Sequence, residues 1–341
     1  MIKTFFVFFL TVLSLIYLPI TAVISNPLTV NIISHSLTNG AGKQVDVTII
    51  KDELERLGHR VNLCDFNIVH EIPTADINLF LAQFKRDWFS QARLNWFVPN
   101  AEVCSVSVHD LQDFDLILCK TKESSKIFSP ICKKIFYLGF TSIDRYDPTL
   151  SLNKNFSKYL HVAGKSRMKG SGAVMKAWAR HSSFPNLTMI KHSKHSGHRT
   201  VDFNDNFQLI TKRISDQELL ILQNECGIHL CPSKTEGFGH YIMEAMSVGA
   251  VVITTNAPPM KEFIKDKRCL VDYILTEKRR YATIYTVDSY GLSLVIKKLN
   301  ALSPEKLQKI GEKNRAEFKR RTEEFRMNFE KLMKRAERDL S

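Results

Sequence analysis

The sequence has 341 residues, of which 44% are hydrophobic and 24% charged, so it is long enough for two α/β domains and excludes a disordered chain. Its formal net charge of +13 indicates an anionic ligand or surface, and a nucleic acid, an acidic membrane and a nucleotide diphosphate all fit. A lysine-rich solvated surface would give the same charge, so composition does not choose among these.

Residues 1–25 form a hydrophobic segment that we set apart from the fold. After Lys3, about twenty residues carry no charge, which is enough to span a bilayer. Pro19 and the small residues up to Ser25 also suit a signal-peptide cleavage region. A signal peptide and an uncleaved anchor both remain open. Either one predicts membrane association through residues 4–25 or entry into the secretory pathway, and a cytoplasm-facing enzyme is not excluded.

The cysteines and sequons leave the membrane topology open. The chain has seven cysteines, an odd number, and those at the ends of core strands do not suit an extracellular disulfide framework. The tripeptides beginning at Asn155 and Asn186 are glycosylation sequons, which matter only in a secretory lumen.

Residues 27–150 alternate predicted strands with helices, which indicates a mainly parallel sheet with ligands at the carboxyl ends of its strands. Strands are predicted at 28–34, 59–63, 77–82, 94–98, 116–119 and 135–138, and a helix at 45–57. The turn 39–42, with Gly40 and Gly42, follows the first strand, where a backbone can approach a diphosphate closely.

Two glycine-lysine pairs resemble a P-loop but lack its spacing. The motif requires a glycine five positions before the pair. Leu37 stands there for Gly42-Lys43, and Tyr159 stands there for Gly164-Lys165. An ATPase or kinase is therefore disfavoured.

In residues 155–300, a strand beginning at Tyr159 runs into a glycine turn with three cations, Lys165, Arg167 and Lys169, and a helix follows from about Ser171. The segment 226–264 then reads as strand, loop, helix and strand. Its loop contains Glu236 and the glycine turn 237–239, and its helix begins at 239 or 240 and contains Glu244. A glycine turn at a helix N-terminus favours anion binding, and carboxylates beside it can accept hydrogen bonds from sugar hydroxyls.

The motif Glu236-x7-Glu244, after an apolar strand that ends in Pro232-Ser233, resembles the E-x7-E signature of retaining GT-B glycosyltransferases, more narrowly family 4 or "group 1". The resemblance implies two Rossmann-like domains that face each other across a cleft, an acceptor domain at 27–150 and a donor domain at 155–300. It also implies retaining transfer of a hexose-type sugar from a nucleotide-diphosphate sugar to a hydroxyl of a glycan, lipid or protein glycan. No cofactor, metal or nucleic-acid partner is expected.

The resemblance implies roles for individual residues. Lys165 and Lys169 would neutralise the diphosphate, Glu236 would orient the sugar, and Glu244 would bind the ribose. Arg213 is a candidate contact of the base, and Glu236 and Lys169 are the candidate catalytic residues. The donor-binding set is Lys165, Lys169, Arg213, Glu236, Gly237, Phe238, Gly239 and Glu244, with Gly40 and Gly42 from the first domain.

The sequence also departs from the family pattern. Many relatives place a histidine on the acceptor side where this chain has Asn100 and Glu102, so these two are the acceptor-side candidates. A common Gly-Gly turn is replaced by Ala257-Pro-Pro, and only Glu262 after it matches, so the sugar cannot be inferred. A phosphorylase or epimerase of the same fold, and a non-catalytic sugar-nucleotide or glycan-binding protein, remain alternatives.

Two further segments complete the chain. His192, His195 and His198 lie in a stretch rich in Lys, Ser and Gly, which we interpret as a basic loop rather than a metal site. Residues 303–341 are predicted to form a basic helix with Pro304 at its first position and a sparse apolar stripe. In GT-B proteins such a helix crosses back to the first domain, and a solvated helical face is the other interpretation.

Overall fold

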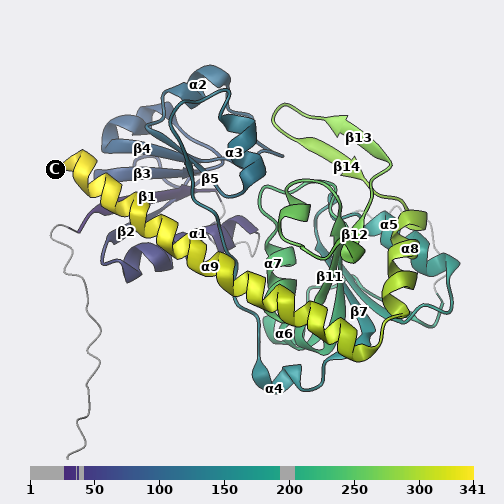
Figure 1. Cartoon of the computed structure of the whole chain (residues 1–341). Coiled ribbons are helices and arrows are strands. Elements are labelled where there is room, and N and C mark those ends of the chain that lie inside the picture. The colour runs from purple at the N-terminus through teal and green to yellow at the C-terminus, as the bar shows by residue number, and fades with distance from the viewer. Residues whose placement is uncertain (1–26, 36, 38–41, 193–203) are drawn as a thin grey trace, which may run out of the picture.

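The computed structural model describes residues 27–35, 37, 42–192 and 204–341, which form two α/β units (Figure 1). Each unit is built on a six-stranded sheet in which all strand pairs are parallel. Central strands such as β10 (Cys226–Cys231) and β11 (Val251–Thr255) are buried along their whole length, because helices cover both faces of a parallel sheet.

The first sheet has the order β2-β1-β3-β4-β5-β6. Its strands are β1 (Thr29–Ser34), β2 (Arg60–Asp65), β3 (Ala75–Leu81), β4 (Ala92–Val98), β5 (Leu116–Cys119) and β6 (Ile135–Tyr137). Its helices are α1 (Gly42–Arg56), α2 (Val108–Gln112) and α3 (Lys122–Phe128), with the 3-10 turn η1 (Arg86–Gln91). The six predicted strands are confirmed to within two residues at each end.

The second sheet has the order β12-β11-β10-β7-β8-β9, where the remaining strands are β7 (Asn155–Gly164), β8 (Asn186–Lys191), β9 (Phe207–Ile210) and β12 (Leu270–Val271). Its helices are α5 (Ser171–Arg180), α6 (Asp216–Glu225), α7 (His240–Ser247) and α8 (Ser289–Asn300), with η2 (Met260–Glu262) and η3 (Lys267–Cys269). Strand order reverses between β7 and β10 here, and between β1 and β3 in the first sheet. Ligands bind open α/β sheets at such switch points.

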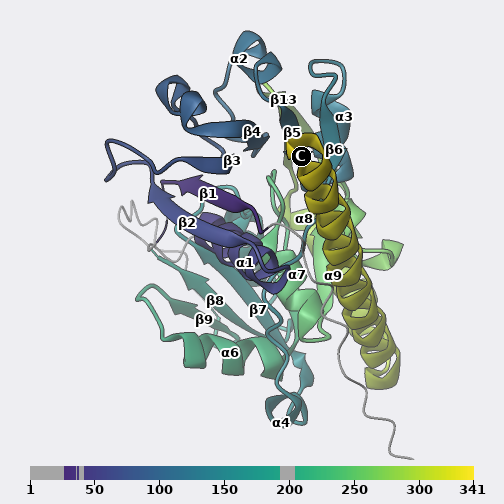
Figure 2. The ribbon, with the colours of Figure 1, turned by 90° about the vertical axis from the view of Figure 1, so that its left-hand side faces the viewer.

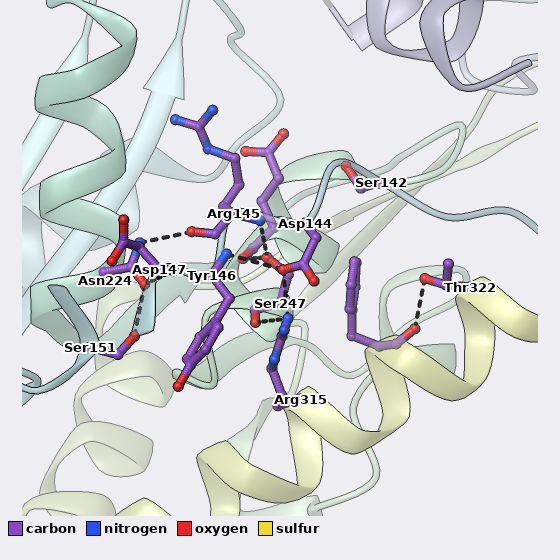
Figure 3. Close-up of polar contacts among 12 residues, drawn as sticks. Ser142, Asp144, Arg145, Tyr146, Asp147, Ser151, Asn224, Ser247, Arg315 and Thr322 are labelled. Atoms are coloured by element: carbon purple, nitrogen blue, oxygen red, sulfur yellow. Dashed lines mark hydrogen bonds and ion pairs between the residues drawn. The ribbon is translucent and has the colours of Figure 1, made fainter. Parts of the chain in front are cut away.

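The linker between the units, residues 138–147, is held by polar contacts and leads into α4 (Pro148–Ser151) (Figure 3). The backbone N–H of Arg145 donates to Ser247 Oγ at 2.9 Å. Asp144 Oδ1 accepts a hydrogen bond from Arg315 at 2.6 Å. The linker is thereby attached both to α7 and to the last helix.

The last helix, α9 (Pro304–Leu340), lies along both units (Figures 1 and 2). Near its start, Asn314 Nδ2 donates to the Ala250 carbonyl of the second unit at 2.9 Å. Further along, Asn328 Nδ2 donates to the Leu138 carbonyl at 3.3 Å. Its apolar stripe is buried, so only the charged side of the helix faces solvent. The stripe consists of Leu307, Ile310, Phe318, Phe325, Phe329, Leu332 and Met333.

A hairpin of the second unit, β13 (Leu275–Lys278) and β14 (Thr283–Thr286), reaches toward the first unit beside α3 (Figure 1). Tyr281 at its tip is only 7% exposed, and its hydroxyl donates to the Val106 carbonyl at 2.8 Å. The Tyr281 ring lies 5.3 Å from the ring of Phe128. The hairpin therefore ends in the small apolar core of the other unit.

Within the described ranges, no helix has the length and apolarity needed to cross a bilayer. The predicted hydrophobic segment, residues 1–25, lies outside the described residues. All seven cysteines lie inside them and are buried free thiols.

Candidate functional site

The candidate site begins where β7 and β10 end, at the switch point of the second sheet. The loops after these two strands are joined, because the Lys234 N–H donates to the Met168 carbonyl at 2.7 Å. Gly170 has a φ of +70°, and a Cβ there would lie 2.1 Å from the Pro232 carbonyl oxygen. Only glycine allows this approach, which brings the Lys169 loop against the loop that carries Glu236.

Lys169 and Glu236 form the centre of this region. Lys169 Nζ donates to Glu236 Oε1 at 2.6 Å, with side-chain exposures of 17% and 11%. The hydroxyl of the fully buried Ser233 donates to the same oxygen. Lys169 Nζ also lies 3.8 Å from the centre of the Tyr241 ring, a cation–π contact. The two residues predicted to be catalytic are therefore in direct contact.

Across the cleft, the loop after β4 faces the glycine turn 237–239. A Cβ on Gly237 would lie 2.7 Å from Asn100 Oδ1 and 2.7 Å from both carboxylate oxygens of Glu102. The sequence placed Asn100 and Glu102 on the acceptor side, and the structure brings them against the turn that follows Glu236. At Gly237 the two units therefore approach so closely that a side chain would not fit.

The side chains of Asn100 and Glu102 are incompletely paired. Asn100 Oδ1 and Glu102 Oε2 are buried and have no hydrogen-bond partner among the described residues. Burial raises the pKa of Glu102, and the nearby Glu236 carboxylate raises it further, against hydrogen bonds from backbone amides that include Gly237. Two unpartnered acceptor oxygens fit a ligand that brings hydroxyl donors.

The N-terminus of α7 meets the N-terminus of α1. His240 Nε2 lies 2.9 Å from Asp46 Oδ1, and Asp46 Oδ2 accepts from Lys120 Nζ at 2.8 Å. Burial alone would raise the pKa of Asp46, but Lys120 and His240 hold it below its usual value. His240 Nδ1 also lies 3.0 Å from Ser142 Oγ in the linker. These four side chains join both units and the linker beside the glycine turn.

The start of α1, after the first βα turn, adds the basic side chain of Lys43 beside the same residues. A Cβ on Gly42 would lie 3.4 Å from His240 Cδ2, so the start of α1 abuts the start of α7. Lys43 Nζ lies 2.9 Å from His35 Nε2. Burial lowers the pKa of Lys43, while Glu102 opposes this effect. Gly40, the other predicted residue of this turn, lies outside the described residues.

Glu244 lies on α7, where it accepts a hydrogen bond from Gln223 Nε2 at 3.0 Å. The predicted pair of glutamates therefore lies on consecutive parts of one loop and helix, each with its own polar partner. Phe238, in the glycine turn, is predicted to contribute its backbone amide. Its ring is only 3% exposed and packs against Phe140 and Phe263, so it can contact a ligand only through its backbone amide.

The other predicted residues have different environments. Lys165 and Arg213 are both exposed, and Gly239, with a φ of +114°, is the N-cap of α7. Glu262 accepts hydrogen bonds from the N–H groups of Lys122 and Glu123 at 3.0 and 2.8 Å, so it caps α3 of the first unit.

A pocket opens between the units beside this cluster. Thr121 and Ser124 line it from the first unit, and Thr235, Glu236 and Gly237 line it from the second. Part of its wall comes from the hairpin that carries Tyr281.

One group of described residues has the spacing of metal ligands, His109, Asp110 and Asp113. Arg86 pairs with both of its carboxylates, at 2.7 and 2.5 Å. Of the three histidines in the basic segment, His192 lies 3.3 Å from the Thr211 carbonyl, and His195 and His198 lie outside the described residues.

Sequence reasoning missed several residues of the site: Asp46, Lys120, Gln223, Ser233, His240 and Tyr241. Signals for two of them were present. Lys120 directly follows the apolar strand β5, at the edge of the sheet where ligands bind, and His240 directly follows the glycine turn. Asp46 and Gln223 carry no such local signal.

Comparison with known families agrees with this geometry. The family model described as glycosyl transferases group 1 matches residues 201–279, the segment that contains both Glu236 and Glu244. No curated protein matches the chain. The narrower assignment to family 4 stays a prediction.

Solved structures share the fold over most of the chain. Sucrose-phosphate synthase from Thermosynechococcus elongatus is 12% identical, with 90% of this chain and 98% of that chain covered at a TM-score of 0.69. A glycosyltransferase from Rickettsia africae is 12% identical, with 91% and 99% covered at 0.67. Anabaena Alr3699/HepE, in complex with UDP-glucose, is 14% identical, with 90% and 100% covered at 0.62. The expected GT-B-like α/β fold with two Rossmann-type parallel sheets is confirmed.

Proposed function

We propose that the protein is a retaining glycosyltransferase that moves a hexose-type sugar from a nucleotide-diphosphate sugar to an acceptor hydroxyl. The observation that carries the proposal is the Lys169–Glu236 pair at a sheet switch point, opposite two buried acceptor oxygens of the other unit. The family-model match over the same segment supports it. The UDP-glucose complex of the similar Alr3699/HepE makes UDP-sugars the first donors to test.

In the proposed mechanism, the donor diphosphate lies at the N-terminus of α7, where free N–H groups and the helix dipole favour anions. Lys169 exchanges its bond to Glu236 for the diphosphate and stabilises the charge that develops on the leaving group. Glu236 and the amides of the turn 237–239 orient the sugar. Glu244 binds the ribose hydroxyls, and the exposed Lys165 and Arg213 close over the diphosphate and base.

The bond changes balance without a cofactor or a side-chain nucleophile. The bond between the anomeric carbon and the diphosphate oxygen breaks, and the acceptor oxygen bonds to the same face of that carbon. The acceptor proton passes to the departing phosphate oxygen, so the anomeric configuration is retained. Asn100 and Glu102 would accept hydrogen bonds from hydroxyls of the bound sugars. A glycan or lipid acceptor and membrane attachment through residues 4–25 belong to the same proposal.

The proposal is tested by a donor screen. UDP-, GDP- and ADP-sugars are added to the full chain, and a rise in melting temperature identifies the donor by linkage. Transfer and donor hydrolysis are then measured for the wild type, Glu236→Ala and Lys169→Ala. If neither substitution changes either rate, the assignment is wrong. Donor binding with no turnover against a broad acceptor panel would instead identify a non-catalytic binding protein, and dependence of the product on inorganic phosphate would identify a phosphorylase.

A further inference from the structure

Gln223 is a buried residue near the end of α6. Both the oxygen and the nitrogen of its side-chain amide form hydrogen bonds to other residues. Gln223 is only 2% exposed. Its Oε1 accepts from Arg145 Nε at 2.9 Å, and its Nε2 donates to Glu244 Oε2 at 3.0 Å. The side chain therefore connects the linker between the units to the second glutamate of the motif.

The chemistry of its neighbours fixes which way the amide points. A guanidinium can only donate, so the oxygen of Gln223 must face Arg145. The amide nitrogen then faces Glu244, whose carboxylate can only accept when ionised. The orientation of Gln223 thus follows from its two partners.

Arg145 is itself held in place by its backbone, whose contacts with Asn224 and Ser247 are drawn in Figure 3, and by its guanidinium. Its guanidinium donates to Asp216 Oδ2 at 3.0 Å and to the Asp216 carbonyl at 3.1 Å, at the start of α6. Its carbonyl accepts from Asn224 Nδ2 at 2.8 Å. Three separate contacts to α6 leave the Nε of Arg145 directed at Gln223.

Only one oxygen of Glu244 is used in this arrangement. Oε2 is bonded to Gln223, whereas Oε1 has no hydrogen-bond partner in the part of the chain that the structure describes. A carboxylate whose rotation is stopped at one oxygen presents the other in a fixed direction. A ligand hydroxyl can then be bound without the entropy of ordering that side chain.

We propose that Gln223 is a positioning residue for ribose recognition: it holds the Glu244 carboxylate in the direction required by a ribose hydroxyl and couples it to the linker through Arg145. The inference rests on the proposed function, because it takes Glu244 as the residue that binds the ribose. It adds that nucleotide affinity depends on a buried amide that itself touches no ligand.

The test uses calorimetric titration of the full chain with UDP and with 2′,3′-dideoxy-UDP, or with the GDP or ADP pair if the wild type prefers that base. Gln223→Leu should weaken UDP binding about tenfold, the value of a lost hydrogen bond to a charged group. It should weaken dideoxy-UDP binding less than twofold, because that ligand lacks the hydroxyls. Gln217→Leu, an exposed position on the same helix, is the matched control and should change neither affinity.

Two further variants separate positioning from a general effect on folding. In a Glu244→Ala background, Gln223→Leu should cause no additional loss of UDP affinity. Gln223→Glu places a second carboxylate beside Glu244, so its UDP affinity should fall more steeply than that of the wild type between pH 6 and pH 8. Melting curves of each variant check that the fold is kept.

Equal weakening of UDP and dideoxy-UDP by Gln223→Leu would overturn the inference while leaving the proposed function intact. Additive losses in the double variant, or a pH profile of Gln223→Glu parallel to the wild type, would overturn it as well. If the wild type binds no nucleoside diphosphate, both the inference and the proposed function are wrong.

Discussion

The two walls of the cleft differ in how their polar atoms are paired. On the wall of the second unit, Glu236 accepts hydrogen bonds from both Lys169 and Ser233. On the wall of the first unit, Asn100 Oδ1 and Glu102 Oε2 are buried without a partner among the described residues. Gly237 brings the two walls together at one point.

The polar groups of the second wall are therefore fixed before a ligand binds, whereas those of the first wall are not fully paired. The second wall holds Lys169 and Glu236 in one geometry. Preorganised charges of this kind suit the proposed stabilisation of a leaving group. The first wall carries the cost of unpaired acceptors, about 1–3 kcal/mol for each buried group. A ligand that donates to those oxygens recovers this free energy, so we expect the first wall to contribute more to substrate affinity than to the stability of the unbound protein.

We expect the largest loss of activity from a substitution on the wall of the second unit, which contains Lys169 and Glu236. Lys169→Ala should lower the rate of transfer about 10²–10³-fold, because it removes a preorganised charge from the leaving group. Lys165→Ala is the control from the same loop and should lower the rate less, since Lys165 is exposed. Rate measurements at saturating donor distinguish the two. Equal losses would show that the Lys169–Glu236 contact has no special role.

The contact between the walls should be nearly as sensitive. Gly237→Ala places a methyl group 2.7 Å from Asn100 Oδ1 and both oxygens of Glu102, so the units must move apart. A displacement of about 1 Å at a reacting centre can lower the rate about 10²-fold. Gly172→Ala, an exposed helical position with nothing within 4 Å, is the matched control and should leave the rate unchanged. Full activity of Gly237→Ala would contradict the close approach of the two walls.

The unpaired wall should show a smaller effect that is confined to substrate affinity. Glu102→Gln should raise the KM for the acceptor about tenfold and leave donor hydrolysis unchanged, because one hydrogen bond to a carboxylate is lost. Glu71→Gln, at an exposed position, should change neither constant. A parallel loss of donor hydrolysis would place Glu102 on the donor side instead.

The same carboxyl predicts a dependence of stability on pH. Burial raises the pKa of Glu102 above the ordinary value of 4.5, so its ionised form is disfavoured in the folded state. The stability that the protonated carboxyl contributes is complete below pH 4.5 and is lost as the pH rises through the folded-state pKa. The melting temperature of Glu102→Gln should therefore equal that of the wild type near pH 4 and exceed it near pH 7. A difference that does not vary with pH would contradict the raised pKa.

The smallest expected effect is at the hairpin that joins the walls. Tyr281→Phe removes the hydrogen bond to the Val106 carbonyl and should lower the free energy of unfolding by about 1 kcal/mol. Tyr290→Phe is the control, since Tyr290 is 68% exposed, and should change it by less than about 0.5 kcal/mol. Denaturant unfolding measures both. A stabilised Tyr281→Phe variant would show that the hydroxyl is poorly paired.

The fold and the wall of the second unit could be predicted because their signals are local. Continuous apolar runs marked the strands, and glycines beside Lys169 and Glu236 marked the turns that bring these residues together. The spacing of the two lysines did not indicate that Lys169 contacts Glu236 while Lys165 is exposed. The position of Lys169 depends on how Gly170 packs against Pro232.

Contacts between the units could not be predicted in the same way. Asp46 and His240 are 194 positions apart, and neither has a neighbour in the sequence that indicates the other. Tyr281 lies in a charged segment typical of a surface hairpin, yet its ring is buried in the opposite unit. Such contacts form when the two folded units pack against each other. A short stretch of sequence carries no information about this packing.

The last helix also has a consequence for synthesis. The side chains of α9 that pack on the linker, such as Phe325 against Phe140, are made after both sheets. During translation, the apolar surface that α9 covers therefore stays exposed until α9 is complete. The nascent protein should accordingly bind chaperones that recognise exposed apolar surface until α9 has been made, although its N-terminal sheet is already encoded in the first 137 residues.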